Sequence, residues 1–181
     1  MLVTEEKKNL RRLIKHQKLL LSEAEIVKQS SCIFARIEGM DIFRDATVVM
    51  AYWSMGDEVR THDFIMKWYR KKTILLPVIE EGHLKACIFS GISSLRQEKT
   101  LGIFEPSGNM YESTGLIDLI IVPGVAFDAD NNRLGRGKAY YDKFLSMSNS
   151  YKIGVCFDLQ MVTKVPVSDK DIRMDIVVTC Q

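Results

Sequence analysis

Short apolar segments recur along this chain, and stretches of helical or turn-like composition separate them. They fall at residues 47–53, 73–79, 84–89, 119–122, 153–157 and 176–179. These segments are rich in β-forming residues, and most are apolar at consecutive positions, as strands buried on both faces are. Buried strands separated by helices predict a layered α/β fold. At 181 residues, the chain is expected to form a single domain over residues 1–181.

The intervening stretches predict helices. Residues 7–21 place apolar side chains at helical spacing and basic side chains on another stripe, which indicates an amphipathic helix. Ser22 and Glu25 have the spacing of a capping box for a second helix that reaches about residue 37. Thr61 can cap a third helix, to about residue 70, and a last helix is expected over residues 138–146.

The composition, 46% hydrophobic and 27% charged, is that of a globular protein. No apolar run approaches the roughly 20 residues that a membrane span needs, and the N-terminus is charged, so we expect a cytoplasmic protein that binds no membrane. Cys32, Cys87, Cys156 and Cys180 are widely separated, which favours buried reduced thiols over a zinc site or a disulfide scaffold. The scattered histidines predict no metal site.

The charge is nearly balanced, with 25 basic and 23 acidic residues and a net charge of +2, so nucleic-acid binding is not expected. The distribution is less even than the total. Basic residues concentrate in residues 7–18 and again at Arg133, Arg136, Lys138 and Lys143. Two basic clusters in a nearly neutral chain indicate a local anionic ligand.

Residues 118–142 are the most informative for function. A buried strand ends at Pro123, and a basic turn containing Gly135 and Gly137 leads into a predicted helix. Glycines allow close approach of the backbone, and a helix N-terminus offers free N–H donors, so the pattern suits a phosphate group. An ordinary basic loop that caps a helix remains the alternative.

Neither common nucleotide-binding motif is present. Ala139 follows Lys138 where a P-loop has Ser or Thr, and Tyr140 occupies the third glycine position of the dinucleotide fingerprint. The local pattern therefore suggests phosphate binding without identifying the ligand.

The segments PGVAFD and RLGRGKAYYD closely resemble the signature of the 5-formyltetrahydrofolate cyclo-ligase family, whose members are also called methenyltetrahydrofolate synthetases. Further blocks that resemble the family follow its order: KKNLRR, YWSMGDEVRT, GIFEP and VPVSDKDIRMD. Together they span nearly the whole chain. The resemblance implies a three-layer α/β domain with a mostly parallel central sheet, similar to the sugar-phosphate isomerase and CoA-transferase-like folds.

Three positions depart from the family pattern. Ala139 stands where the family usually has Gly, and we expect it to fit because that backbone position should already be helical. Lys170 stands where His is frequent and removes any hydrogen bond that an imidazole would make there. Asn131 replaces a common Gly, and Asn tolerates a left-handed turn better than most residues.

The resemblance implies an ATP-dependent cyclisation of 5-formyltetrahydrofolate. ATP phosphorylates the formyl oxygen, N10 attacks the activated carbon, and phosphate leaves to give 5,10-methenyltetrahydrofolate and ADP. The substrate supplies both nucleophiles, so positioning and charge stabilisation should dominate catalysis. Mg²⁺ is the implied cofactor, ATP is a co-substrate, and a monomer is expected.

The resemblance also assigns residues to the site. Those expected to bind ATP are Lys7, Lys8, Arg11, Arg133, Leu134, Gly135, Arg136, Gly137, Lys138, Ala139, Tyr140 and Tyr141. Lys138 and Arg136 are the expected catalytic residues. Those expected to bind the folate are Trp53, Glu58, Glu105, Tyr140 and Tyr141. Asp142 and Asp175 are the expected metal ligands.

Two other functions remain open on the sequence. A folate- or nucleotide-binding protein without turnover would keep the pocket, but it would not need carboxylates for a metal beside a phosphate site. An RNA-binding module could use the basic first helix, but the chain has no RNA-binding fingerprint.

Overall fold

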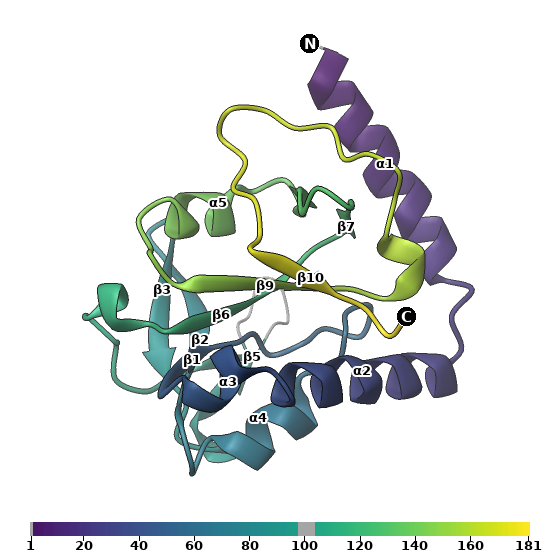
Figure 1. The fold of residues 1–181 in the computed structure, drawn as a ribbon. Helices are drawn as coiled ribbons and strands as arrows, with labels where there is room; N and C mark the ends of the chain where they lie inside the picture. Colours follow the sequence, from purple (N-terminus) through teal and green to yellow (C-terminus); the bar gives the residue numbers. More distant parts are fainter. Residues whose placement is uncertain (1, 98–103) are drawn as a thin grey trace.

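The computed structural model describes residues 2–97 and 104–181 and contains a central sheet between helices (Figure 1). In these residues the sheet has six strands in the order β10-β9-β6-β1-β2-β3. The strands are β1 (Val48–Met50), β2 (Thr73–Glu80), β3 (His83–Ile88), β6 (Leu119–Pro123), β9 (Tyr151–Val155) and β10 (Ile176–Val178). Only the β2–β3 pair is antiparallel among these pairings, so the expectation of an α/β fold with a mostly parallel sheet is confirmed.

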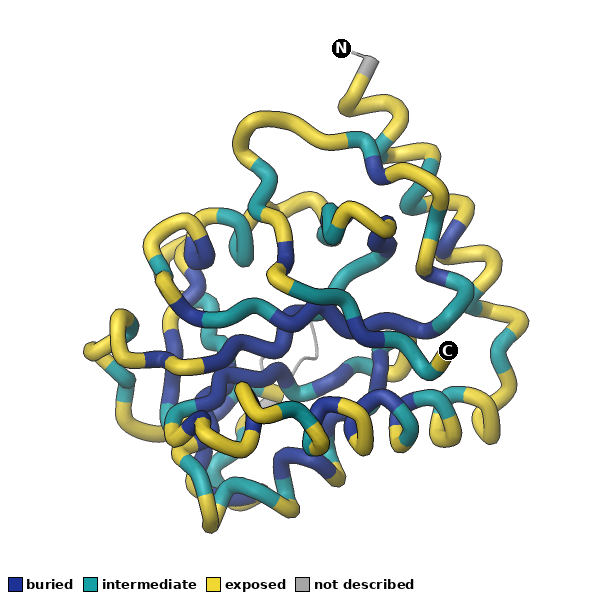
Figure 2. Tube along the Cα trace, in the orientation of Figure 1, coloured by how far each residue is buried: buried dark blue, intermediate teal, exposed yellow. Residues whose placement is uncertain are grey.

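Helices cover both faces of this sheet, and the first helix lies beside it. They are α1 (Leu2–Lys18), α2 (Glu23–Glu38), α3 (Asp41–Asp45), α4 (His62–Trp68) and α5 (Tyr140–Leu145). Val49 and Ile121 pack in one core with residues of α2, α3 and α4, whereas Met50 and Ile120 pack in a second core with residues of α5. Neighbouring residues of β1 and β6 thus enter opposite cores, which is why consecutive residues of these central strands are buried (Figure 2).

Local signals for the helices are mostly confirmed. The hydroxyl of Ser22 accepts from the amide of Glu25, and the carboxylate of Glu25 accepts from the amide of Ser22, which completes the capping box of α2. Thr61 precedes α4 as expected, but its hydroxyl donates to the Tyr52 carbonyl rather than capping the helix. The helix α3 was not predicted, because a helix of five residues carries little periodicity.

The sequence patterns also did not predict two short hairpins. One pairs β4 (Leu95–Gln97) with β5 (Phe104–Pro106), and the other pairs β7 (Ala126–Phe127) with β8 (Arg133–Leu134). In the turn between β7 and β8, Asn131 adopts φ 62, so the expected left-handed turn is confirmed. The first residues of the GIFEP block, 102 and 103, lie outside the described residues.

The first helix packs beside the second hairpin rather than on the sheet. Ile14 of α1 is fully buried in a small core with Ala126, Leu134 and Val165. This packing fixes the basic stripe of α1 close to the segment that leads into α5. Three 3-10 turns complete the described elements: η1 (Ile92–Ser94), η2 (Thr114–Leu116) and η3 (Asp158–Gln160). No helix in the described part of the chain is long and apolar enough to cross a membrane.

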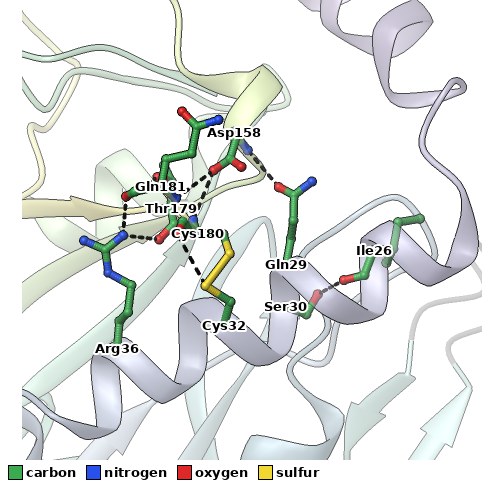
Figure 3. The surroundings of a disulfide bond; sticks show 9 residues. All are labelled: Ile26, Gln29, Ser30, Cys32, Arg36, Asp158, Thr179, Cys180 and Gln181. Atoms are coloured by element: carbon green, nitrogen blue, oxygen red, sulfur yellow. Dashed lines mark hydrogen bonds between the residues drawn. A yellow bond between two sulfur atoms is a disulfide. The ribbon is translucent and has the colours of Figure 1, made fainter.

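The expectation of reduced thiols is wrong for Cys32 and Cys180, which form a disulfide (Figure 3). Their Cα atoms lie 5.4 Å apart because α2 runs beside the chain end that follows β10, although 148 residues separate them in sequence. Asp158 also holds this end by accepting from the amide of Cys180 at 3.1 Å. Cys87 and Cys156 are buried and free, as expected.

Replacing Cys32 by serine is expected to lower the melting temperature by roughly 5–15 °C, because a disulfide that closes so long a loop restricts the unfolded chain. Differential scanning calorimetry of oxidised protein measures the change. Reduced wild-type protein should melt with the variant, and a Cys32→Ser/Cys180→Ser double variant should melt no lower. Equal melting temperatures for oxidised and reduced wild type would contradict the disulfide.

Candidate active site

A cavity of about 240 Å³ lies past the carboxyl ends of β1 and β6. Ligands of open α/β sheets commonly bind at this edge. Most of the residues that the sequence singled out line it: Trp53, Glu58, Glu105, Arg133, Gly135, Arg136, Gly137, Lys138, Ala139, Tyr140, Tyr141 and Asp142. The fold therefore brings the glycine-containing turn and the segment after β1 to one site, although about 80 residues of sequence separate them.

The turn formed by residues 135–138 (the glycine turn) lies close to two arginine side chains. A Cβ on Gly135 would lie 3.0 Å from Nη1 of Arg133, so a side chain there would crowd the guanidinium. Gly137 has φ 103, a conformation that favours glycine. Arg11 of α1 donates from Nε to the carbonyl of Gly135 at 2.8 Å, so α1 holds the turn from outside.

Lys138 presents its charge at this turn. Its side chain is exposed and lines the cavity. Within residues 2–97 and 104–181 its ammonium makes no hydrogen bond or ion pair. An unpaired cation beside an exposed glycine turn is suited to an anionic group.

Arg133 lies beneath the turn, which differs from the expectation that it contacts phosphate. It is 5% exposed, and it donates to the Pro123 carbonyl at 3.2 Å and to Asp142 Oδ1 at 2.9 Å. Its guanidinium also faces the ring of Tyr141 at 5.5 Å. A buried cation needs partners on the protein, and these contacts supply them. Arg133 therefore supports the structure of the cavity.

Arg136 and Glu58 meet at the side of the cavity. Arg136 donates from Nη2 and Nε to Glu58 Oε1, at 3.0 and 3.3 Å. The other oxygen of Glu58 accepts from the amide of Met55 at 3.0 Å. Only 10% of the Glu58 side chain is exposed, and its carboxylate is held in one orientation.

The rest of the cavity is apolar, and the sequence did not assign its residues to the site. They are Tyr52, Met55, Leu76, Pro77, Ile79, Leu84, Phe104, Pro123 and Gly124. The signal that could have found several of them is their place at or near the carboxyl ends of predicted strands. Trp53 packs on His62 with ring centres 4.2 Å apart, which fixes it as one wall. Glu105 accepts from the amide of Ile79 at 3.2 Å.

Tyr141 contributes a polar atom to this apolar part. Its hydroxyl is buried and has no hydrogen-bond partner among the described residues. Burial and the nearby charge of Glu58 raise the pKa of Tyr141, although the positive charge of Arg133 acts to lower it. The hydroxyl therefore stays protonated and can donate to an acceptor on a ligand.

Comparison with known proteins identifies the family. The model of the 5-formyltetrahydrofolate cyclo-ligase family matches residues 3–180. The chain belongs to this family. It is 29% identical to the 5-formyltetrahydrofolate cyclo-ligase of Mus musculus, over 96% of this chain and 93% of that protein. The Escherichia coli K12 cyclo-ligase is 34% identical over 74% of this chain and 78% of its own length.

A solved structure of the family has the same fold. The NMR structure of 5,10-methenyltetrahydrofolate synthetase from Aquifex aeolicus superposes with a TM-score of 0.87 and is 30% identical. The superposition covers 97% of this chain and 90% of the Aquifex aeolicus chain. The cyclo-ligase family thus accounts for both the sequence blocks and the arrangement of the sheet.

The two carboxylates that the family pattern assigns to a metal do not lie together. Asp142 lines the cavity and is bonded to Arg133, whereas Asp175 precedes β10 at the amino end of the sheet and pairs with Lys152 at 2.8 Å. No group of three or more His, Cys, Asp or Glu in the described part of the chain could hold a metal. Asp142 fits an Mg²⁺ ion held mainly by phosphates and water, and Asp175 does not.

The three basic residues of α1 that the family pattern assigns to ATP lie in different environments. Arg11 reaches the glycine turn, and Lys7 pairs with Asp171 in the loop before β10. The side chain of Lys8 is 73% exposed. It does not lie with the other residues that were expected to bind ATP. Leu134 is 1% exposed and packs on α1, which gives it a structural position behind the turn.

The expectation that Ala139 occupies a helical position is wrong. Its φ of 55 and ψ of 18 place it in the left-handed region, and α5 begins only at the next residue, Tyr140. Glycine, which the family pattern implies at this position, adopts this conformation without strain because it has no Cβ. The helix α5 has six residues, three fewer than expected over residues 138–146, and two of the three are lost because this turn delays its start.

Replacing Ala139 by glycine is expected to stabilise the fold by about 0.5–1 kcal/mol, because relief of the left-handed strain exceeds the added entropy of the unfolded chain. Urea unfolding followed by circular dichroism measures the difference. The matched control is Ala35→Gly at an exposed helical position of α2, which should destabilise by about 1 kcal/mol. A loss of stability in the Ala139 variant would count against the left-handed assignment.

Proposed function

We propose that this member of the family catalyses the ATP-dependent conversion of 5-formyltetrahydrofolate to 5,10-methenyltetrahydrofolate, with release of ADP and phosphate. Several curated relatives carry the name of this ligase, and they match along most of the chain. The observation that carries the proposal is that one cavity holds both a phosphate-type turn and a carboxylate beside apolar walls. A phosphoryl donor and a flat heterocyclic acceptor can therefore meet at one site.

The pterin ring lies in the apolar part of the cavity. Its amino group and ring N–H are donors, and the Glu58 carboxylate can accept from them. Trp53 and Phe104 supply apolar walls for the ring. The unpartnered hydroxyl of Tyr141 has a free donor that can orient an oxygen of the substrate.

The triphosphate lies along the glycine turn. Lys138 and the exposed backbone of residues 135–138 face the transferring phosphoryl group, and Arg136 stands beside it. The formyl oxygen displaces ADP from the terminal phosphorus, N10 then forms its bond to the formyl carbon, and the C–O bond breaks as phosphate leaves. The N10 proton is released to solvent. The protein accelerates these steps by alignment and by neutralising phosphate charge.

Mg²⁺ is proposed to accompany ATP. The ion would neutralise phosphate charge, and Asp142, which lines the cavity, would hold it or its water. Oδ1 of Asp142 already accepts from Arg133 and from the amide of Ile172, which leaves Oδ2 for a ligand or its water. A cytoplasmic location and a monomeric state stay predictions.

The test follows absorbance at the band of the methenyl product, with purified protein, 5-formyltetrahydrofolate and Mg²⁺, in the presence and absence of ATP. An increase that needs protein and ATP, with one ADP per product, would support the cyclo-ligase reaction. A protein-free control is needed because acid alone cyclises the substrate. Binding of both ligands without turnover would instead favour a non-catalytic binding protein.

A further inference from the structure

Asp57 lies at the centre of an ion-pair chain beside the cavity, although the family pattern assigns it no role. Its Oδ1 accepts from Arg136 Nη2 at 2.6 Å, and its Oδ2 accepts from Lys18 Nζ at 2.9 Å. Lys18 is the last residue of α1, and only 9% of its side chain is exposed. The carboxylate therefore connects the end of α1 to the glycine turn.

Arg136 needs such a partner because its place on the turn gives its side chain little support from neighbouring residues. It stands between Gly135 and Gly137, and about half of its side chain is exposed. A long side chain on a glycine-flanked turn loses conformational freedom when a ligand fixes it, and this loss weakens binding. Three charge-assisted bonds from one guanidinium, one to Asp57 and two to Glu58, orient it before a ligand arrives.

The two acceptors of Arg136 differ in what else they must do. Glu58 is the nearly buried carboxylate proposed to accept from the pterin, whereas Asp57 is half exposed and does not line the cavity. If Asp57 were absent, Glu58 would be the remaining carboxylate that holds Arg136 in the described part of the chain. Arg136 would then keep its bonds to Glu58 Oε1 but lose the bond to Asp57, and its guanidinium would be held less firmly at the glycine turn.

We propose that Asp57 is a positioning residue for Mg·ATP: together with Glu58 it holds the guanidinium of Arg136 at the glycine turn. This inference rests on the proposed function. Nη1 of Arg136 makes no hydrogen bond within the described residues, so it remains available for a phosphate oxygen while Nη2 stays on Asp57. Lys18 anchors the carboxylate from the opposite side.

The charge state of Asp57 suits this task. Partial burial acts to raise its pKa, but the hydrogen bonds from Lys18 and Arg136 outweigh it, and the pKa lies below its usual value. The carboxylate is therefore ionised at neutral pH, and the bond to Arg136 is charge-assisted throughout the range in which the enzyme would be assayed.

The test compares Asp57→Asn with wild type in steady-state kinetics and thermal melting. The KM for Mg·ATP should rise about 5–20-fold, and the KM for 5-formyltetrahydrofolate should change less than about threefold. Asp57→Glu should restore the KM for Mg·ATP to within about threefold of wild type. Asp45→Asn, at an exposed carboxylate of α3, is the matched control and should leave both constants unchanged.

An unchanged KM for Mg·ATP in Asp57→Asn would overturn the inference. Equal rises in both KM values with a lower melting temperature would also overturn it, because they indicate a merely structural residue. Calorimetric titration of Mg·ATP separates this failure from that of the proposed function. Wild type that neither turns over nor binds Mg·ATP refutes the proposed function, whereas active wild type with a normal Asp57→Asn variant refutes only the role of Asp57.

Discussion

Lys138→Ala is expected to lower kcat/KM for ATP by about 100-fold or more while leaving the fold intact. The ammonium is exposed at the glycine turn and has no partner within residues 2–97 and 104–181, so its removal breaks no internal bond there. A charge aimed at the transferring phosphoryl group contributes most where charge moves during the reaction. Removal of one such group commonly costs about 10²–10³ in rate.

The experiment measures initial rates at varied ATP and saturating folate, together with binding of 5-formyltetrahydrofolate by calorimetry. Folate affinity should change less than about threefold. Lys143→Ala is the control, because Lys143 is an exposed lysine on α5, one turn beyond the site. Lys138→Ala with the activity of Lys143→Ala would remove Lys138 from the site.

The sheet was predictable because its strands are buried on both faces. Residues such as Val49 and Met50 pack into different cores, and this requires the consecutive apolar positions that the sequence displays. The capping box of Ser22 and Glu25 depends on residues close in sequence, and the folded chain forms it as predicted. The start of α5 was less predictable, because nothing local reveals that Ala139 adopts a left-handed conformation.

The site was predictable where it depends on residue type, and less so where it depends on packing. Gly135, Gly137 and Lys138 form the turn that their sequence suggests. By contrast, burial of Arg133 beneath that turn is a long-range result of its contacts with the Pro123 carbonyl and Asp142. The sequence pattern of a basic residue near a glycine is the same whether its side chain faces a ligand or the protein interior.

Residues distant in sequence were hardest to assign. The disulfide of Cys32 and Cys180 forms because α2 packs beside the chain end. The spacing of the cysteines in the sequence does not indicate this packing. Asp175 shows the opposite case: its carboxylate accepts from the amide of Lys152 and so joins the amino ends of β9 and β10, away from the cavity. An acidic residue before a strand carries no sign of which edge of the sheet it will occupy.

Glu58→Gln is expected to lower kcat/KM for 5-formyltetrahydrofolate by about 10–100-fold. The substitution keeps the size of the side chain and an oxygen for the Met55 amide. It removes the negative charge that accepts from the pterin amino group and ring N–H, and hydrogen bonds to a charged partner are worth about 1.5–3 kcal/mol. The loss should raise the KM for folate, because the contact exists before the reaction begins.

The KM for Mg·ATP should change less than about threefold in this variant, because Arg136 keeps its bond to Asp57 at 2.6 Å. Glu58→Gln is therefore expected to raise the KM for folate, and Asp57→Asn the KM for Mg·ATP. This difference is expected although the two carboxylates are adjacent and share one arginine. Glu112→Gln, at an exposed loop position, controls for the loss of a charge. If Glu58→Gln raised the KM for Mg·ATP instead, the carboxylate would act mainly through Arg136, and the pterin would need another acceptor in the cavity.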